Sequence, residues 1–450
     1  MMCMKENKTK AVIKTLMKLL VFMFILVLLL EAAGFATNRP NAYTRIMLHE
    51  MYKEEDIDLV FIGASRTYRG FAPYVIDEEL GSKSFNMGSS AQGIVDTYYL
   101  LEEMYKYHSP EVVVICINHG GLYRRSNTRK SEILIDYYKP SFNKIMYMKS
   151  AFKPEDYPKA LFPALRKGNR NIKTSLAPSL VLERLRTKLS SEYLDYSYSL
   201  VTYDDARYAG RGFVYSYESL GDNIGNIRNS MRWRPDNIDS ARIEYIGKAV
   251  RLCKKNGSVP ILVHMPPSFI YMERLAGYSG FQDCMDDIAS SNGVDFFDFA
   301  LIKRSVFERS NAQYNDSNHL NGEGAEEFSR VFSKFLSEYT DGTLEADNYL
   351  YSSYNELMQD LDYVLSTWLT WEDDHFEAVA SCGTAIRPEF EFLYKADNDD
   401  GYTLLRPYGE DPVVPRVDAG GESYTLRVNA RAVGSDDDYE QYDEMRIGAN

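Results

Sequence analysis

Two short segments of the sequence contain residue types that could together cleave an ester. The first, Asp58-Leu-Val-Phe-Ile-Gly-Ala-Ser65, is an apolar stretch that ends in small residues and a serine. The second, Asp316-Ser-Asn-His319, places a carboxylate three positions before a histidine. A serine hydroxyl becomes an effective nucleophile when a base removes its proton, and a carboxylate can orient that base. Ser65, His319 and Asp316 therefore form a candidate catalytic triad.

Spacing alone does not single out this histidine. The chain has six histidines, and two of them follow an acidic residue by three positions. His375 follows Glu372 in an acidic stretch near the C-terminus, whereas His319 lies in a segment rich in Asn and Gly. A purely structural Asp-x-x-His is common, but the combination with a serine at a strand end favours catalysis by His319.

Alternating strands and helices must position these segments. Apolar runs predict five strands, because the strands of a covered parallel sheet are buried on both faces. The predicted strands are 58–63, 82–87, 111–117, 260–265 and 295–299. Stretches with helical spacing of apolar residues are 73–80, 93–107, 238–256, 281–292 and 322–339. This alternation predicts an α/β domain with a three-layer, doubly wound parallel sheet of flavodoxin-like type.

In such sheets ligands bind at the carboxyl ends of the strands. Ser65, Gly88, Asn118 and His264 all lie at or just beyond the ends of predicted strands, and the Asp316–His319 loop follows the fifth strand. The motifs and the predicted topology therefore point to the same edge of the sheet.

The motifs resemble those of the SGNH (GDSL-type) hydrolase superfamily. The similar blocks are Phe61-Ile-Gly-Ala-Ser-Arg-Thr-Tyr68, Ser84-Phe-Asn-Met-Gly88 and Asp316-x-x-His319. Ala64 stands where the family usually has Asp, and the third block, usually Gly-x-Asn-Asp, reads Ile117-Asn-His-Gly120 here. The resemblance covers residues 56–119 and 258–337, about a third of the chain.

This resemblance implies a role for each residue that matches a motif. Ser65 would be the nucleophile, His319 the base and Asp316 the carboxylate that orients it. The oxyanion hole would comprise the N–H groups of Ser65 and Gly88 and the side chain of Asn118. Each fixed donor there is worth about 3–4 kcal/mol. Capping of a strand end is the alternative role for Asn118.

Further polar residues near the same edge are candidates for substrate contact. They are Arg66, Arg69, His119 and His264. For the two histidines, packing or solvation is the ordinary alternative. The arginines could meet an anionic group or solvate the rim.

The N-terminal residues 1–37 have the pattern of a membrane segment. Several lysines precede the apolar run Leu19–Leu30, which extends towards Ala36. Positive charge before such a run keeps the N-terminus in the cytoplasm and sends the remainder across the membrane. A cleaved signal peptide is the alternative, since Gly34 and Ala36 fit a small-x-small site. Both interpretations place residues 38–340, the expected catalytic domain, outside the cytoplasm.

Two further regions differ in composition from the α/β part. Residues 121–237 are rich in Tyr, and residues 121–230 carry 19 Lys and Arg against 11 Asp and Glu, a net charge of +8. We expect an insertion over the active-site face or a helical decoration. Residues 341–450 carry 7 Lys and Arg against 25 Asp and Glu, a net charge of −18. They predict a connection over 348–371 that is helical or mixed, followed by a small antiparallel β-sandwich.

The expected function is a membrane-tethered serine esterase that removes O-acyl groups, such as O-acetyl, from cell-surface glycans. Relatives in the superfamily imply, as an alternative, an acyltransferase for a glycan or teichoic acid beside a membrane-bound O-acyltransferase. An inactive glycan-binding scaffold is a third interpretation. The sequence has no phosphate-binding loop, no His-Glu-x-x-His and no paired-cysteine zinc site, so we expect no cofactor, no metal and no nucleic acid partner.

Overall fold

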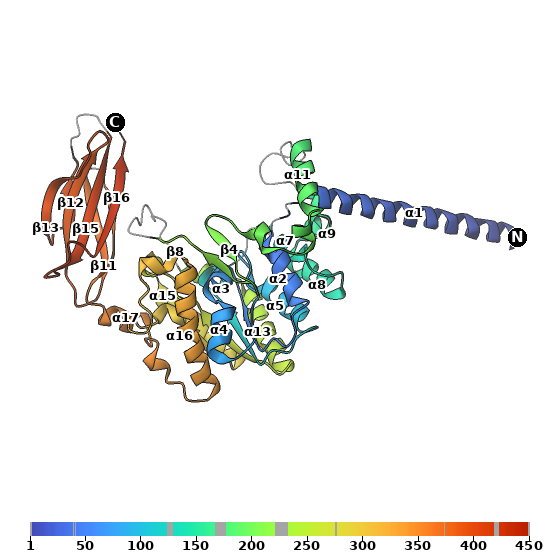
Figure 1. Cartoon of the computed structure of the whole chain (residues 1–450), viewed down its shortest axis with the longest axis horizontal. Helices are drawn as coiled ribbons and strands as arrows, with labels where there is room; N and C mark the ends of the chain where they lie inside the picture. The colour runs from blue at the N-terminus through green and yellow to red at the C-terminus, as the bar shows by residue number, and fades with distance from the viewer. Residues whose placement is uncertain are drawn as a thin grey trace.

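The computed structural model describes residues 2–38, 40, 42–123, 129–166, 177–220, 233–274, 277–372, 374–417 and 423–448. Figure 1 shows a long N-terminal helix that projects from a central α/β body, with a β domain on the opposite side of that body. The predicted fold class is therefore confirmed.

The central sheet has five parallel strands in the order β2-β1-β3-β6-β7. Its strands are β1 (Leu59–Ile62), β2 (Ser84–Asn86), β3 (Val112–Cys116), β6 (Val259–His264) and β7 (Asp295–Asp298). All five coincide with the apolar runs that predicted them. Because every connection crosses over through at least one helix, the carboxyl ends of all the strands meet at one edge.

Successive side chains of each strand point to opposite faces, so each face has its own core. Val60 and Ile62 of β1 face one core, and Leu59 and Phe61 face the other. The first core is covered by α5 (Ile94–Met104), α13 (Ser240–Lys255) and α15 (Tyr278–Asn292). The second is covered by α4 (Pro73–Leu80) and α16 (Gly322–Thr340).

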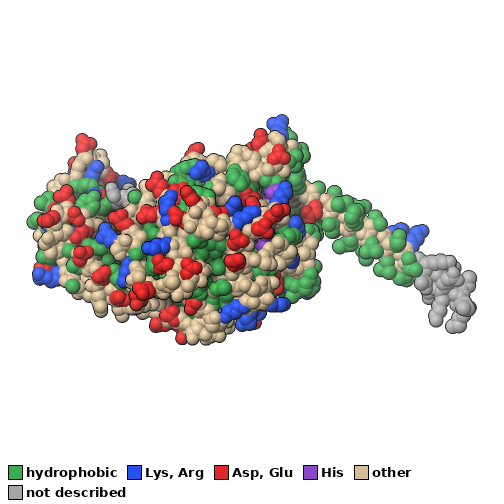
Figure 2. Space-filling model, turned by 60° about the horizontal axis from the view of Figure 1, so that its bottom comes forward, with side chains coloured by type: hydrophobic (Ala, Val, Ile, Leu, Met, Phe, Trp, Pro, Cys, Tyr) green, Lys and Arg blue, Asp and Glu red, His purple; other side chains and the backbone are tan. Residues whose placement is uncertain are grey.

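The N-terminal helix α1 (Met2–Thr37) is long and apolar enough to cross a membrane over Val12–Thr37, and a membrane anchor and a signal sequence both have these properties. Hydrophobic side chains predominate on its surface from Val12 onward (Figure 2). Its C-terminal end contacts α11 (Pro178–Lys188), where the Arg184 Nη1 donates to the Thr37 carbonyl at 2.7 Å.

The predicted insertion divides into two structural parts. Its helical part packs beside α5, where Ser131 and Tyr147 both donate hydrogen bonds to Asp96. Its hairpin lies at the carboxyl edge of the sheet, where the Arg211 carbonyl accepts a bond from the Asn86 amide at 2.9 Å. The elements are α7 (Arg129–Ile135), α8 (Phe142–Ala151), α9 (Tyr157–Leu161), α11, α12 (Ser191–Leu194), β4 (Ala206–Tyr208) and β5 (Val214–Ser216). Residues 124–128, 167–176 and 221–232 of the insertion lie outside the described residues.

Shorter elements connect these layers at the carboxyl edge. They are α2 (Tyr43–Met51), α3 (Ser65–Gly70), α6 (His119–Leu122), α14 (Phe269–Arg274), β8 (Tyr314–Asp316) and β9 (His319–Leu320). The strands β8 and β9 form a small antiparallel pair, which makes the Asp316–His319 segment a tight turn.

The C-terminal β domain contains two antiparallel sheets, ordered β10-β11-β14 and β13-β12-β15-β16, around a core of their own. Its strands are β10 (Val364–Trp371), β11 (His375–Cys382), β12 (Pro388–Ala396), β13 (Thr403–Gly409), β14 (Val413–Pro415), β15 (Tyr424–Ala432) and β16 (Gln441–Ile447). Of the stretch 348–371, expected to be helical or mixed, α17 (Tyr354–Asp360) is helical and the residues from Val364 onward belong to β10.

The segment before this domain belongs to the α/β core. The Tyr351 amide donates to the Leu301 carbonyl, and Leu350 and Leu357 are buried among core residues. The α/β body therefore extends about 20 residues beyond Thr340, where the sequence analysis ended it.

Candidate active site

Ser65 occupies a sharp turn between β1 and α3. It is the first residue of α3 and follows β1 after only Gly63 and Ala64. The turn requires glycine, because a Cβ atom at position 63 would lie 2.5 Å from Thr67 Oγ1 and 2.8 Å from Cys116 Cβ. This close approach to β3 presents the Ser65 side chain at the carboxyl edge of the sheet.

The turn between β8 and β9 brings His319 to Ser65. The His319 Nε2 atom lies 2.7 Å from the Ser65 Oγ atom. The Nδ1 atom lies 2.9 Å from both carboxylate oxygens of Asp316. Asp316 Oδ1 also accepts the backbone N–H groups of Asn318 and His319 at 2.8 and 3.0 Å. The three residues singled out by the sequence thus lie in hydrogen-bonding contact.

The contacts of Asp316 fix its charge. Partial burial raises the pKa of this carboxyl group, but the hydrogen bonds from His319 and Asn318 together lower the pKa by more than burial raises it. The pKa of Asp316 therefore lies below the ordinary value. Asp316 is therefore ionised at neutral pH and accepts the proton on His319 Nδ1. The lone pair on Nε2 then faces the Ser65 hydroxyl, which is the arrangement that general-base catalysis needs.

The three expected oxyanion donors differ in availability. The Ser65 N–H begins α3 and donates to no acceptor among the described residues. Asn118 caps α6 through Oδ1, which accepts the Gly121 N–H at 3.0 Å. That bond leaves the Nδ2 group of Asn118 as a donor, so capping and oxyanion binding are compatible.

The expectation for Gly88 does not agree with the structure. Its N–H donates to the Asn86 Oδ1 atom at 3.0 Å and is therefore already paired. The Asn86 side chain is buried and in turn donates to the carbonyls of Thr67 and Phe71, which holds it in place. The sequence could not reveal this competition, because it depends on a side chain two residues away.

Three of the four residues expected to contact substrate, Arg66, His119 and His264, are buried instead. Arg66 is 7% exposed, and its guanidinium donates to His264 Nε2 at 3.0 Å and to Asn318 Oδ1 at 2.7 Å. His264 has no exposed surface, and burial lowers its pKa more than the adjacent Asp298 raises it. His119 packs against Tyr271, and burial followed by the charge of Arg66 lowers its pKa to about 3.

Three polar residues that the sequence analysis did not select take part in this buried layer. Asp298, the last residue of β7, accepts bonds from the Tyr278 hydroxyl and from His264 Nδ1. Asn318 joins the layer to the Asp316–His319 turn. An acidic residue at the end of a buried strand was the available signal for Asp298. No comparable pattern marked Asn318 or Tyr278.

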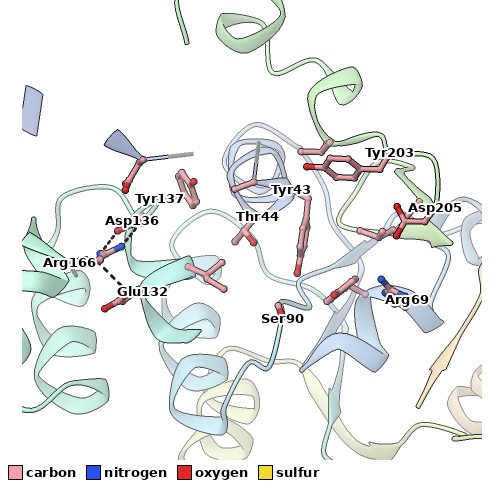
Figure 3. Close-up of a pocket in the computed structure, with 17 residues that line it drawn as sticks. Tyr43, Thr44, Arg69, Ser90, Glu132, Asp136, Tyr137, Arg166, Tyr203 and Asp205 are labelled. Carbon is pink, nitrogen blue, oxygen red and sulfur yellow. Dashed lines mark hydrogen bonds and ion pairs between the residues drawn. The ribbon is translucent and has the colours of Figure 1, made fainter. Parts of the chain in front are cut away.

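A cavity of about 470 Å³ lies beside the nucleophile helix (Figure 3). Tyr68 and Arg69 of α3 line one part of it, one helical turn after Ser65. Arg69 also donates to Asn315, next to Asp316. Most of the other lining residues come from α2 and from the insertion, among them Tyr43, Thr44, Glu132, Asp136, Tyr137, Arg166, Val201, Tyr203, Asp205 and Val214.

The charges that line this cavity are nearly balanced. Arg166 forms a bidentate pair with Asp136 at 2.6 and 2.7 Å and lies 3.7 Å from Glu132 (Figure 3). Asp205 adds a third carboxylate and Arg69 a second guanidinium. The basic balance of the insertion therefore does not produce a positively charged cavity. Within the part of the chain that the structure describes, no group of three or more His, Cys, Asp or Glu side chains could hold a metal ion.

No model of a protein family and no curated protein matches this chain. Two solved structures are similar to it. One is a provisionally assigned acylhydrolase from Bacteroides fragilis, and the other is a GDSL-like lipase from Bacteroides thetaiotaomicron. They share 12% and 13% sequence identity with this chain and cover 66% and 69% of it, which corresponds to 94% and 100% of their own lengths. Both TM-scores are 0.30, so neither similarity bears on the activity of this chain.

Proposed function

We propose that this chain is an SGNH-type serine esterase that removes O-acyl groups, such as O-acetyl, from glycans at the cell surface. The observation that carries this proposal is the 2.7 Å contact between His319 Nε2 and Ser65 Oγ, with Asp316 bound to the other ring nitrogen. In the proposed reaction, Ser65 Oγ attacks the ester carbonyl while His319 takes its proton. His319 then returns that proton to the departing sugar oxygen.

Water completes the cycle in this proposal. It gives a proton to His319 and attacks the acyl–Ser65 ester, so that the carboxylic acid leaves and the serine hydroxyl is restored. Negative charge on the carbonyl oxygen would be stabilised by the Ser65 N–H and the Asn118 Nδ2 group. The paired Gly88 amide would contribute only if it released Asn86 Oδ1.

The cavity beside α3 supports a sugar rather than a charged polymer as the group next to the ester. Its volume is in the range of small-ligand sites, and tyrosine side chains offer faces that pack on the C–H surface of a sugar ring. Its nearly balanced charges favour a neutral ring. The apolar helix α1 supports a location at the membrane, with the catalytic body on the extracytoplasmic side.

The test combines a small ester with an acylated glycan. The wild-type protein should hydrolyse p-nitrophenyl acetate and release acetate from O-acetylated cell-wall glycan, and the Ser65→Ala variant should do neither. Hydrolysis of both by Ser65→Ala would exclude the proposed nucleophile. Transfer of the acetyl group to an added oligosaccharide, with little free acetate, would identify the activity as an acyltransferase.

A further inference from the structure

A row of hydrogen-bonded side chains, buried except for the half-buried Asn318, links the end of β7 to the turn that carries His319. Asp298 Oδ1 lies 3.0 Å from His264 Nδ1, and His264 Nε2 lies 3.0 Å from Arg66 Nη1. Arg66 Nη2 then donates to Asn318 Oδ1 at 2.7 Å. The backbone N–H of Asn318 donates to Asp316 Oδ1 at 2.8 Å. The row is continuous from the sheet to the carboxylate of the candidate triad.

The proton positions along this row follow from Arg66. A guanidinium is always charged and can only donate, so His264 Nε2 must accept its hydrogen bond. The proton of the neutral imidazole is therefore on Nδ1, where Asp298 accepts it. Tyr278 contributes a second bond to Asp298, and its Oη atom lies 3.1 Å from His264 Nδ1. One tautomer and one ring orientation satisfy every bond.

Arg66 is attached directly to the nucleophile, because it follows Ser65 in α3. Its guanidinium lies over the ring of Tyr271, 4.3 Å from the centroid, and the side chain is almost fully buried. Two acceptors at fixed positions and a stacked ring leave this planar group little freedom. Arg66 therefore sets the position of Asn318 relative to the first turn of α3.

Other contacts hold the same loop. Arg69 of α3 donates to Asn315 on the other side of Asp316, near the surface. The Ser268 hydroxyl donates to the Ser317 carbonyl at 2.7 Å, and Ser268 belongs to the segment between β6 and α14. The Arg66–Asn318 bond is a partly buried link between the nucleophile helix and the turn, and Arg66 itself is almost fully buried.

We propose that Arg66 and His264 are positioning residues, which hold Asn318 and with it His319 at the distance from Ser65 that proton transfer requires. His264 acts through Arg66, and neither contacts substrate. The proposal rests on the esterase function, and a misplacement of about 1 Å at such a site can lower the rate about 100-fold.

Two matched pairs of variants test this role. Asn318→Ala removes the acceptor for Arg66 at a half-buried position, whereas Asn318→Asp retains an oxygen there. His264→Asn can still donate to Asp298 but does not reach Arg66, whereas the longer Gln side chain in His264→Gln extends to the position of Nε2. Both His264 variants lose the ring, so they share the cost of the space it leaves.

The first readout is the hydrolysis of p-nitrophenyl acetate by the full-length protein. We expect kcat to fall at least about 10-fold in Asn318→Ala and in His264→Asn, with KM unchanged. Asn318→Asp and His264→Gln should keep most of the wild-type kcat. Equal activity within both pairs, whether lost or retained, would overturn the proposal.

The second readout does not depend on activity. Hydrogen–deuterium exchange of the peptide spanning residues 315–321 should be faster in Asn318→Ala and His264→Asn than in their partners, at unchanged melting temperature for Asn318→Ala. A turn that exchanges as slowly as in the wild type would overturn the positioning role. Failure of the esterase proposal would differ, since the wild type and Ser65→Ala would then have the same activity while the exchange difference remained.

Discussion

The side chains of Ser65 and His319 meet at 2.7 Å although 254 residues separate them in the sequence. Each is carried by a tight turn at the carboxyl edge of the sheet: Ser65 follows β1, and His319 begins β9 directly after the turn from β8. Parallel connections bring all strand ends to this edge, so residues from distant segments converge there. Contact between the two residues follows from topology combined with two local turns.

Replacement of Asp316 should reduce activity without abolishing it. Asp316→Asn leaves a side chain of the same shape but removes the charge that fixes the proton on His319 Nδ1. We expect kcat for p-nitrophenyl acetate to fall about 10²–10⁴-fold. Asp374 provides a matched control, because it contacts His375 at 2.7 Å on the exposed surface of the β domain. Asp374→Asn should leave kcat unchanged, and an Asp316→Asn enzyme of normal activity would contradict the assignment.

Gly63→Ala should distort the nucleophile turn. The added methyl group would displace Thr67 Oγ1 and would overlap the Cβ and carbonyl oxygen of Cys116, which cannot move without shifting β3. We expect unfolding free energy to fall by about 1–3 kcal/mol and kcat to fall as well. Urea denaturation and ester hydrolysis measure the two effects. Gly401→Ala, where an added Cβ meets no atom within 4 Å, should change neither.

Acid should destabilise the protein through its buried histidines. Burial lowers the pKa of His119 to about 3, so the unfolded chain binds a proton below its ordinary pKa of about 6.5 while the folded protein does not. The unfolding free energy therefore falls as pH drops from about 6.5 towards about 3, by up to about 1.4 kcal/mol per pH unit for each such histidine. His119→Gln should show a smaller loss of stability between pH 7 and pH 5 by urea denaturation. The same slope as the wild type would refute this account.

The β domain should be dispensable for cleavage of a small ester. It contributes none of the residues at the candidate site, whereas Leu350, Leu357 and Leu361, which precede it, are buried in the α/β core. Leu365 of β10 also joins that core. A chain that ends at Asp362 should fold by circular dichroism and retain kcat for p-nitrophenyl acetate. A chain that ends at Thr340 should be less stable, since it exposes the core that Leu350 and Leu357 cover. Loss of activity in a well-folded chain ending at Asp362 would show that the β domain helps to form the site.

The sequence revealed the sheet and the triad because both leave local patterns. Buried parallel strands appear as solid apolar runs, and all five were found within two residues of their ends. Tertiary orientation leaves no such pattern. His264 stands at a strand end, as expected of a site residue, but its ring points into the protein towards Asp298. The pairing of Gly88 with Asn86 likewise depends on how the backbone turns after β2. The boundary between α17 and β10 was not found within the stretch 348–371, expected to be helical or mixed, because the apolar residues of β10 follow those of α17 closely.

The most direct test of the account is to trap the acyl-enzyme. We predict that brief incubation with p-nitrophenyl acetate followed by acid quenching adds the mass of one acetyl group to the peptide that contains Ser65, and that Ser65→Ala abolishes this adduct. His319→Ala should slow its formation by several orders of magnitude, because no base then activates the hydroxyl. An acetyl group found on another residue in the wild type, or an adduct that forms equally fast in His319→Ala, would contradict the proposed mechanism.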